Sequence, residues 1–203
     1  MIKFFLYSKV LFFITIAILS STSLNACNEE IIEGKTETRR IIIRAEKKQD
    51  SDAIGTVIKN AFAGRDYSTN NEDEFIDALR MAGALSVALV AERDSEVAGY
   101  IAFSPITIDE KDVRWFCMAL LSVSPNLQKQ GIGTQLVKAG LDELKQLGGV
   151  GCVLLGDPGY YGRFGFAARE ELTLEGAPPR ILFGFPFRGE CATRKCAISP
   201  SFC

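Results

Sequence analysis

Histidine is missing altogether from this chain of 203 residues. Its absence excludes Ser-His-Asp and Cys-His nucleophilic catalysis, the HExxH zinc site and an imidazole general base. No metal site is expected either, because histidine is the commonest side-chain ligand of metals in proteins. Any chemistry that this protein performs must therefore use carboxylates, tyrosine, lysine, cysteine or backbone dipoles.

An excess of positive charge is also missing. Lys and Arg number 23 against 25 Asp and Glu, which gives a formal net charge of -2. The chain lacks the basic field that attracts nucleic acids, and it has no DNA-binding motif, so we expect no nucleic-acid partner. Apolar residues make up 47% and charged residues 24% of the chain, as is typical of one folded domain of this length.

The N-terminal segment contains no apolar run of the about 20 residues that a membrane-spanning helix needs. Lys3 and Lys9 instead precede a short apolar stretch, residues 10–19, and small polar residues follow. This is the layout of a secretory signal. The sequence Leu-Asn-Ala-Cys then ends at Cys27 and resembles the lipidation site of bacterial lipoproteins, although Asn25 departs from that pattern.

We therefore expect residues 1–27 to be signal-like or lipoprotein-like, residues 28–38 to be a polar linker, and residues 39–203 to form the domain. Export, or membrane attachment through residues 1–27, follows from this interpretation. An upstream start codon or an uncleaved anchor would explain the same pattern.

The cysteines leave the compartment open. Five follow Cys27, and an odd number excludes a complete set of disulfides. Cys117 and Cys152 lie in strand-like runs and are expected to be buried, free and inert. Cys191 and Cys196 could form a disulfide if the domain is exported.

Apolar periodicity and turn residues divide the domain into helices and strands. We expect strands at 41–44, 113–125, 153–158, 180–187 and 191–198, a hairpin over 85–108 that turns at Asp94-Ser95, and helices from residue 50 or 51, within 70–83 and at about 133–147. The first of these helices has apolar residues at Ile54, Val57, Ile58, Ala61 and Phe62. The last helix has one apolar face, formed by Leu136, Val137, Gly140, Leu141, Leu144 and Leu147. Because it lies between two strands, it implies a parallel pair with a right-handed crossover. The pattern predicts a mixed α/β, or α+β, fold whose other strands are antiparallel.

A glycine turn, Gln128-x-x-Gly131-x-Gly133, joins the long apolar strand to this helix. The first turn of a helix carries unpaired N–H groups and a positive partial charge, and glycines let the backbone approach a ligand closely. Such a turn suits a phosphate or diphosphate. The dinucleotide pattern GxGxxG is excluded by Leu136, and the Walker pattern is absent. On these residues alone, a purely structural role of the two glycines, in forming the turn, is also open.

The stretch "LSVSPNLQKQGIGTQLVKAGL" resembles the acyl-CoA-binding core of the GNAT superfamily of N-acyltransferases, whose signature [Gln/Arg]-x-x-Gly-x-[Gly/Ala] follows an apolar strand. The downstream "GDPGYYGRFGFAA" resembles bacterial N-acetyltransferases of the YhbS type, and the similarity runs from about Ile41 to Phe202. The resemblance implies a GNAT-like central sheet that is mostly antiparallel and flanked by helices, with one parallel strand pair splayed at the cofactor site.

The resemblance also implies an enzyme that uses acetyl-CoA as co-substrate and transfers the acetyl group to a primary amine by direct attack on the thioester. The acceptor would be an amine-bearing small molecule or peptide, and the sequence leaves its identity and the oligomeric state open. The cofactor-binding residues implied are Leu121, Ser122, Val123, Gln128, Lys129, Gln130, Gly131, Ile132, Gly133 and Thr134. The amide of Val123 would polarise the acyl carbonyl.

Tyr161 is the catalytic residue that the resemblance implies, because it lies five residues before the Phe of the Gly165-Phe166 pair and would protonate the leaving thiolate. The asparagine that the family usually has seven residues before this tyrosine is replaced by Leu154, which indicates a rearranged helix after the strand. The general base stays open among a water chain and the carboxylates of Asp157, Glu72, Asp73, Glu74 and Glu92.

A second interpretation is a GNAT fold that binds CoA or another ligand without turnover, on an exported or membrane-anchored protein. Acetyl-CoA is a cytosolic metabolite, so an exported location favours this alternative. A cytoplasmic location, usual for the family, favours the enzyme.

Overall fold

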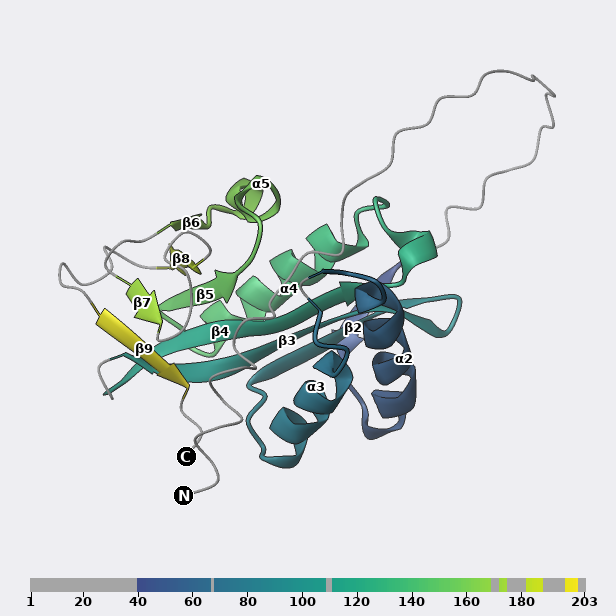
Figure 1. Cartoon of the computed structure of the whole chain (residues 1–203), viewed down its shortest axis with the longest axis horizontal. Coiled ribbons are helices and arrows are strands. Elements are labelled where there is room, and N and C mark those ends of the chain that lie inside the picture. Colours follow the sequence, from purple (N-terminus) through teal and green to yellow (C-terminus); the bar gives the residue numbers. More distant parts are fainter. Residues whose placement is uncertain are drawn as a thin grey trace, which may run out of the picture.

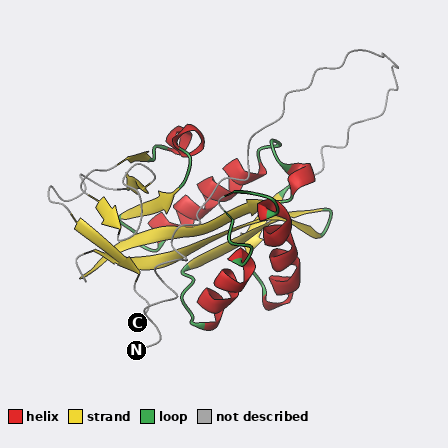
Figure 2. Cartoon of the chain, in the orientation of Figure 1, coloured by secondary structure: helices red, strands yellow, loops and turns green. Residues whose placement is uncertain are grey.

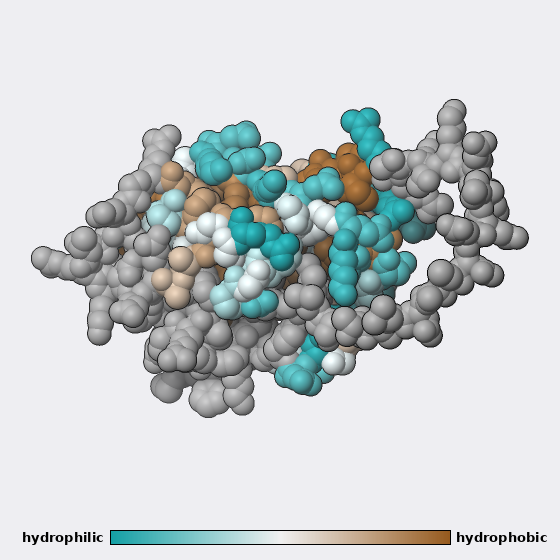
Figure 3. Space-filling view, turned by 90° about the horizontal axis from the view of Figure 1, so that it is seen from above, coloured by the Kyte–Doolittle hydropathy of each residue, from teal (hydrophilic) through white to brown (hydrophobic). Residues whose placement is uncertain are grey.

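The computed structural model describes residues 40–66, 68–108, 111–168, 172–174, 182–187 and 196–200. The predicted signal-like segment and linker, the lipidation of Cys27 and the pairing of Cys191 with Cys196 depend on residues outside these ranges, and they stay predictions. No helix within the described ranges combines the length and hydropathy needed to cross a membrane. Seen from above, the described surface carries brown hydrophobic patches separated by teal and white residues (Figure 3).

One mixed sheet organises the described chain (Figures 1 and 2). The order along its main path is β1-β2-β3-β4-β5-β8-β6, and β9 pairs with both β3 and β7. The strands are β1 Ile42–Ala45, β2 Val87–Arg93, β3 Glu96–Ile108, β4 Lys111–Val123, β5 Gly151–Leu155, β6 Ala167–Ala168, β7 Leu172–Leu174, β8 Leu182–Pro186 and β9 Cys196–Pro200. The helices are η1 Lys48–Asp50, α2 Ser51–Phe62, α3 Glu72–Met81, η2 Pro125–Leu127, α4 Ile132–Gln146, α5 Pro158–Tyr161 and η3 Gly162–Phe164.

Helices cover both faces of the sheet (Figure 1). On one face α2 and α3 bury the apolar positions predicted for α2, namely Ile54, Val57, Ile58, Ala61 and Phe62. On the other face α4 packs its Leu136, Val137, Leu141 and Leu144 against β3 and β4. The amphipathic pattern of each helix therefore fixes which side of the sheet it lies against.

The connections follow the turn residues in the sequence. Asp94 and Ser95 both have left-handed backbone angles, with φ of 53° and 67°, and they join β2 to β3 as the predicted hairpin turn. The crossover through α4 makes β4 and β5 parallel, while β1–β2, β2–β3, β3–β4 and β5–β8 are antiparallel. The predicted mixed α/β fold class is therefore confirmed.

Strands β4 and β5 pair over only a short length. Trp115, Phe116 and Cys117 face residues 151–153, and from Met118 onward β4 has no described partner on that side. The register of β4 against β3 also shifts between Phe103 and Ala102, which leaves Ala119 as the extra residue of a β-bulge. Strands β4 and β5 therefore splay apart towards the carboxyl end of β4, close to the start of α4.

Several details differ from the sequence predictions. Leu147 is 55% exposed instead of buried, because α4 ends at Gln146 and Gly148 turns the chain away with φ of 77°. The short strands β6 and β7 were not predicted, since two or three residues carry too little periodicity to be recognised. A second parallel ladder joins β7 to β9.

Candidate cofactor site at the start of helix α4

The turn before α4 is built by three local features. The side-chain amide of Gln128 donates a 3.1 Å hydrogen bond from Nε2 to the carbonyl of Val123, which closes the chain back on the end of β4. Lys129 and Gly131 adopt left-handed angles, with φ of 62° and 83°. A β-carbon at Gly131 would meet no atom within 4 Å, so the backbone angle rather than crowding favours glycine there.

Helix α4 begins without a side-chain cap. Gly131 is its N-cap residue and has no side chain to accept from the first-turn amides. The N–H groups of the first turn are therefore available to a ligand, and the helix dipole adds positive potential. A helix of 15 residues that starts in this way is suited to an anion.

The outer side of the turn is anchored to the β2–β3 hairpin. Arg93 at the end of β2 donates from Nη1 to Oε1 of Gln130 at 2.9 Å. The same Gln130 side chain donates from Nε2 to the carbonyl of Asn126 at 3.3 Å. The Gln130 side chain therefore fixes the turn. The prediction that Gln130 binds the cofactor concerns its backbone amide and stays a prediction.

A pocket of about 200 Å³ opens in front of this helix start. Seven of the residues predicted to bind the cofactor line it, namely Val123, Gln128, Lys129, Gly131, Ile132, Gly133 and Thr134. Leu127, Tyr160 and Arg163 complete the described lining, which contains two cationic side chains and no carboxylate. The electrostatic character of the pocket is positive, as an anionic group requires.

Leu121 and Ser122 lie further back along β4. Leu121 is 4% and Ser122 1% exposed, so their side chains are buried in the two opposite faces of the sheet. Both residues belong to the part of β4 that has no described partner on the β5 side. They could contribute backbone groups to a ligand that enters the splay between the strands.

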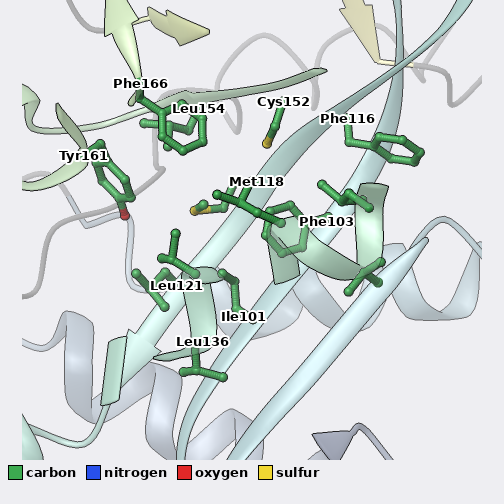
Figure 4. Packing of buried hydrophobic residues seen from close by; sticks show 14 of the residues in the cluster. Ile101, Phe103, Phe116, Met118, Leu121, Leu136, Cys152, Leu154, Tyr161 and Phe166 are labelled. Carbon is green, nitrogen blue, oxygen red and sulfur yellow. The ribbon is translucent and has the colours of Figure 1, made fainter. Parts of the chain in front are cut away.

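The short helix α5 forms the opposite wall of the site. Asp157 caps it by accepting from the amide of Gly159 at 2.9 Å, and Pro158 occupies its first turn. Tyr160 and Tyr161 are both buried and pack edge to face, with ring centroids 4.8 Å apart. Gly156 is needed beside Tyr161, because a β-carbon there would lie 2.7 Å from its ring. Figure 4 shows the Tyr161 hydroxyl pointing towards the part of β4 that carries Leu121.

Tyr160 and Arg163 were not singled out by the sequence analysis. The Tyr160 hydroxyl is buried and makes no hydrogen bond to a described residue. Burial raises the pKa of Tyr160, while the Arg163 guanidinium and the nearby Thr134 hydroxyl, which does not reach hydrogen-bond geometry, act against that rise. Arg163 lies 4.4 Å from the centre of the Tyr160 ring. The tyrosine pair Tyr160-Tyr161, followed two residues later by Arg163, is the sequence pattern that could have drawn attention to them.

The predicted general-base candidates are mostly engaged elsewhere. Glu72 accepts hydrogen bonds from Ser68 and from the amide of Thr69, and the Asp73 carboxylate lies 3.0 Å from the Lys59 ammonium. Glu92 accepts from Arg44 at 2.8 Å. Asp157 is the α5 cap, and Glu74 is exposed. These roles are structural, and none of the five carboxylates lines the described pocket.

Comparison with known proteins finds one family and several relatives. The acetyltransferase (GNAT) family profile matches residues 52–166. An N-acetyltransferase of uncharacterised function from Escherichia coli K12, YhbS, is 38% identical over 135 residues, which cover 65% of this chain and 78% of that protein.

Solved structures agree with this relationship. A GNAT family acetyltransferase from Brucella melitensis in complex with acetyl-CoA is 40% identical, with a TM-score of 0.69 over 78% of this chain and 96% of that one. YhbS from Escherichia coli in complex with CoA is 32% identical, with a TM-score of 0.68 over 76% of this chain and 85% of that one. The sheet, the splay and the glycine turn thus occur in a chain that belongs to the GNAT family of acetyltransferases.

Proposed function

We propose that this protein is an acetyl-CoA-dependent N-acetyltransferase that acetylates a primary amine. The observation that carries the proposal is the uncapped start of α4, which faces a positive pocket at the end of the splay between β4 and β5. Two relatives above 30% identity bind acetyl-CoA or CoA, and this cofactor joins an anionic diphosphate to a long thioester arm.

The cofactor would lie along the splay. The backbone of residues 128–134 would hold the diphosphate with the free amides of the first turn of α4. Leu121, Ser122 and Val123 would line the pantetheine arm with unpaired strand backbone. The amide of Val123 would donate to the thioester oxygen and stabilise its negative charge in the transition state.

The transfer needs no covalent enzyme intermediate. The lone pair of a neutral amine attacks the thioester carbonyl carbon, so that a C–N bond forms and the C–S bond breaks. The amine loses a proton to water or to a base, and the CoA thiolate gains one. Tyr161 would donate that proton, because its hydroxyl points towards β4 from the wall formed by α5.

The test measures acetyl-CoA binding by calorimetry in Gly131→Val and in a matched control, Gly83→Val. Both glycines have left-handed angles, with φ of 83° and 66°, and open space around the missing β-carbon. The two variants therefore carry similar backbone strain, but only Gly131 lies at the pocket. We expect Gly131→Val to lose binding and Gly83→Val to keep it. Equal acetyl-CoA affinity in both variants and the wild type would contradict the proposal.

A measurement of turnover distinguishes an acetyltransferase from a GNAT fold that only binds its ligand. Release of the CoA thiol in the presence of a panel of amines and peptides would establish transfer. Tight binding of acetyl-CoA with no thiol release for any amine would favour the alternative, a GNAT fold that only binds its ligand.

A further inference from the structure

The Tyr160 hydroxyl is the buried polar group of the pocket that the expected mechanism does not use. The residue is 3% exposed, and its hydroxyl makes no hydrogen bond to a described residue. Tyr160 nevertheless lines the pocket together with Thr134 of the first turn of α4. A buried hydroxyl without a hydrogen-bond partner is costly, and a ligand bound in this pocket would supply the missing partner.

Arg163 is held over the ring of this tyrosine by two contacts. Its Nε donates to the carbonyl of Tyr160 at 2.8 Å, and its guanidinium stacks on the Tyr160 ring at 4.4 Å. These two contacts hold an otherwise exposed side chain at the pocket and leave its terminal N–H groups as donors. Such a planar cation suits a phosphate oxygen.

We propose that Tyr160 and Arg163 bind the diphosphate of the cofactor from the side opposite to α4, the hydroxyl and the guanidinium each donating to a phosphate oxygen. This inference rests on the proposed function and adds two specificity-determining side chains to the backbone amides. The pocket holds both donors, Lys129 and the start of α4 within about 200 Å³. A phosphate-containing group bound in this pocket would face all of these donors.

The arrangement has a structural consequence. The diphosphate would link α4, which follows β4, to α5, which follows β5. Cofactor binding would thereby join the two sides of the splay through Tyr160, whose ring packs against Tyr161. The residue expected to protonate the leaving thiolate would be fixed at the same moment as the cofactor.

Tyr160→Phe tests the hydroxyl alone, because the ring and its contacts with Tyr161 and Arg163 are kept. A hydrogen bond to a charged group predicts that CoA affinity falls about tenfold or more. The melting temperature of the free protein should stay equal or rise, since the change removes a buried polar atom without a partner. A merely structural hydroxyl would lower the melting temperature and leave CoA affinity unchanged.

Arg163→Met tests the cation, and Lys138→Met is its matched control. Lys138 is an exposed cation on α4, so both variants lose one positive charge. Affinities are measured by calorimetry for CoA and for dephospho-CoA, which keeps the diphosphate and lacks the 3′-phosphate. We expect Arg163→Met to weaken both ligands by the same factor of about ten, and Lys138→Met to change neither by more than about twofold.

Three outcomes overturn the inference. Wild-type affinity in both Tyr160→Phe and Arg163→Met would remove the two side chains from the site while leaving the proposed function intact. A loss confined to CoA, with dephospho-CoA unaffected, would move Arg163 to the 3′-phosphate. Failure of the wild-type protein to bind either ligand would refute the proposed function and this inference together.

Discussion

Replacing Gly140 by alanine tests how closely α4 lies on the sheet. A β-carbon at this position would lie 2.3 Å from Cε2 and 2.7 Å from Cζ of Phe103. Carbon atoms in contact normally lie about 3.5–4.0 Å apart, so the ring or the helix must move by about 1 Å. Phe103 is fully buried in the core on that face, so its ring has little room to move.

Two opposing terms decide the sign of the effect. Alanine stabilises a helix interior over glycine by up to about 1 kcal/mol. Overpacking a filled core costs about 1–3 kcal/mol, and the short distances to Phe103 place Gly140 towards the upper end. We therefore expect Gly140→Ala to lower the free energy of unfolding by about 1–2 kcal/mol.

Gly55 on α2 supplies the matched control. A β-carbon there would lie 4.0 Å from Cβ of Asp73, which is an ordinary contact distance. Gly55→Ala should consequently raise the free energy of unfolding by about 0.5–1 kcal/mol. Urea unfolding followed by circular dichroism measures both variants. If Gly140→Ala proves as stabilising as Gly55→Ala, the tight packing of α4 on β3 is refuted.

Three further results are expected. Tyr161→Phe should keep the wild-type affinity for acetyl-CoA but slow thiol release by about 10²–10⁴-fold, and unchanged turnover across pH would remove Tyr161 from the mechanism. The hydrogen bond from Arg44 holds the pKa of Asp50 below its usual range, so this carboxylate stabilises the fold above its unfolded pKa of about 4 and loses that effect as the pH falls through its lower folded value. Asp50→Asn should therefore lower the free energy of unfolding by about 1.5–3 kcal/mol at neutral pH. Urea unfolding measures this difference from the wild type, which should become smaller in acid. Cys152 is buried as expected, whereas Cys117 is only half-buried. Desolvation raises the pKa of the Cys117 thiol to about 12 and that of Cys152 well above its ordinary value, so iodoacetamide with peptide mapping should label neither residue in the native protein at neutral pH and both in urea.

Local sequence determined the helices, the long strands and the turn before α4. The positions predicted to be buried in α2 are buried because a 3.6-residue period places them on one face. Gly131 has a left-handed backbone angle, and glycine is the residue that adopts this angle most readily because it has no side chain. These features depend on neighbours within a few residues along the chain, and periodicity and turn chemistry are therefore sufficient to predict them.

Features that depend on distant segments were not accessible in this way. Glu92 was a candidate base, but its carboxylate accepts a hydrogen bond from Arg44, which lies 48 residues away in the sequence. Tyr160 and Arg163 received no role from the sequence, yet the structure places them at the pocket that α4 opens onto. Their segment follows β5, and β5 lies parallel to β4. The carboxyl ends of parallel strands share one edge of a sheet, so only strand pairing brings α5 to the start of α4.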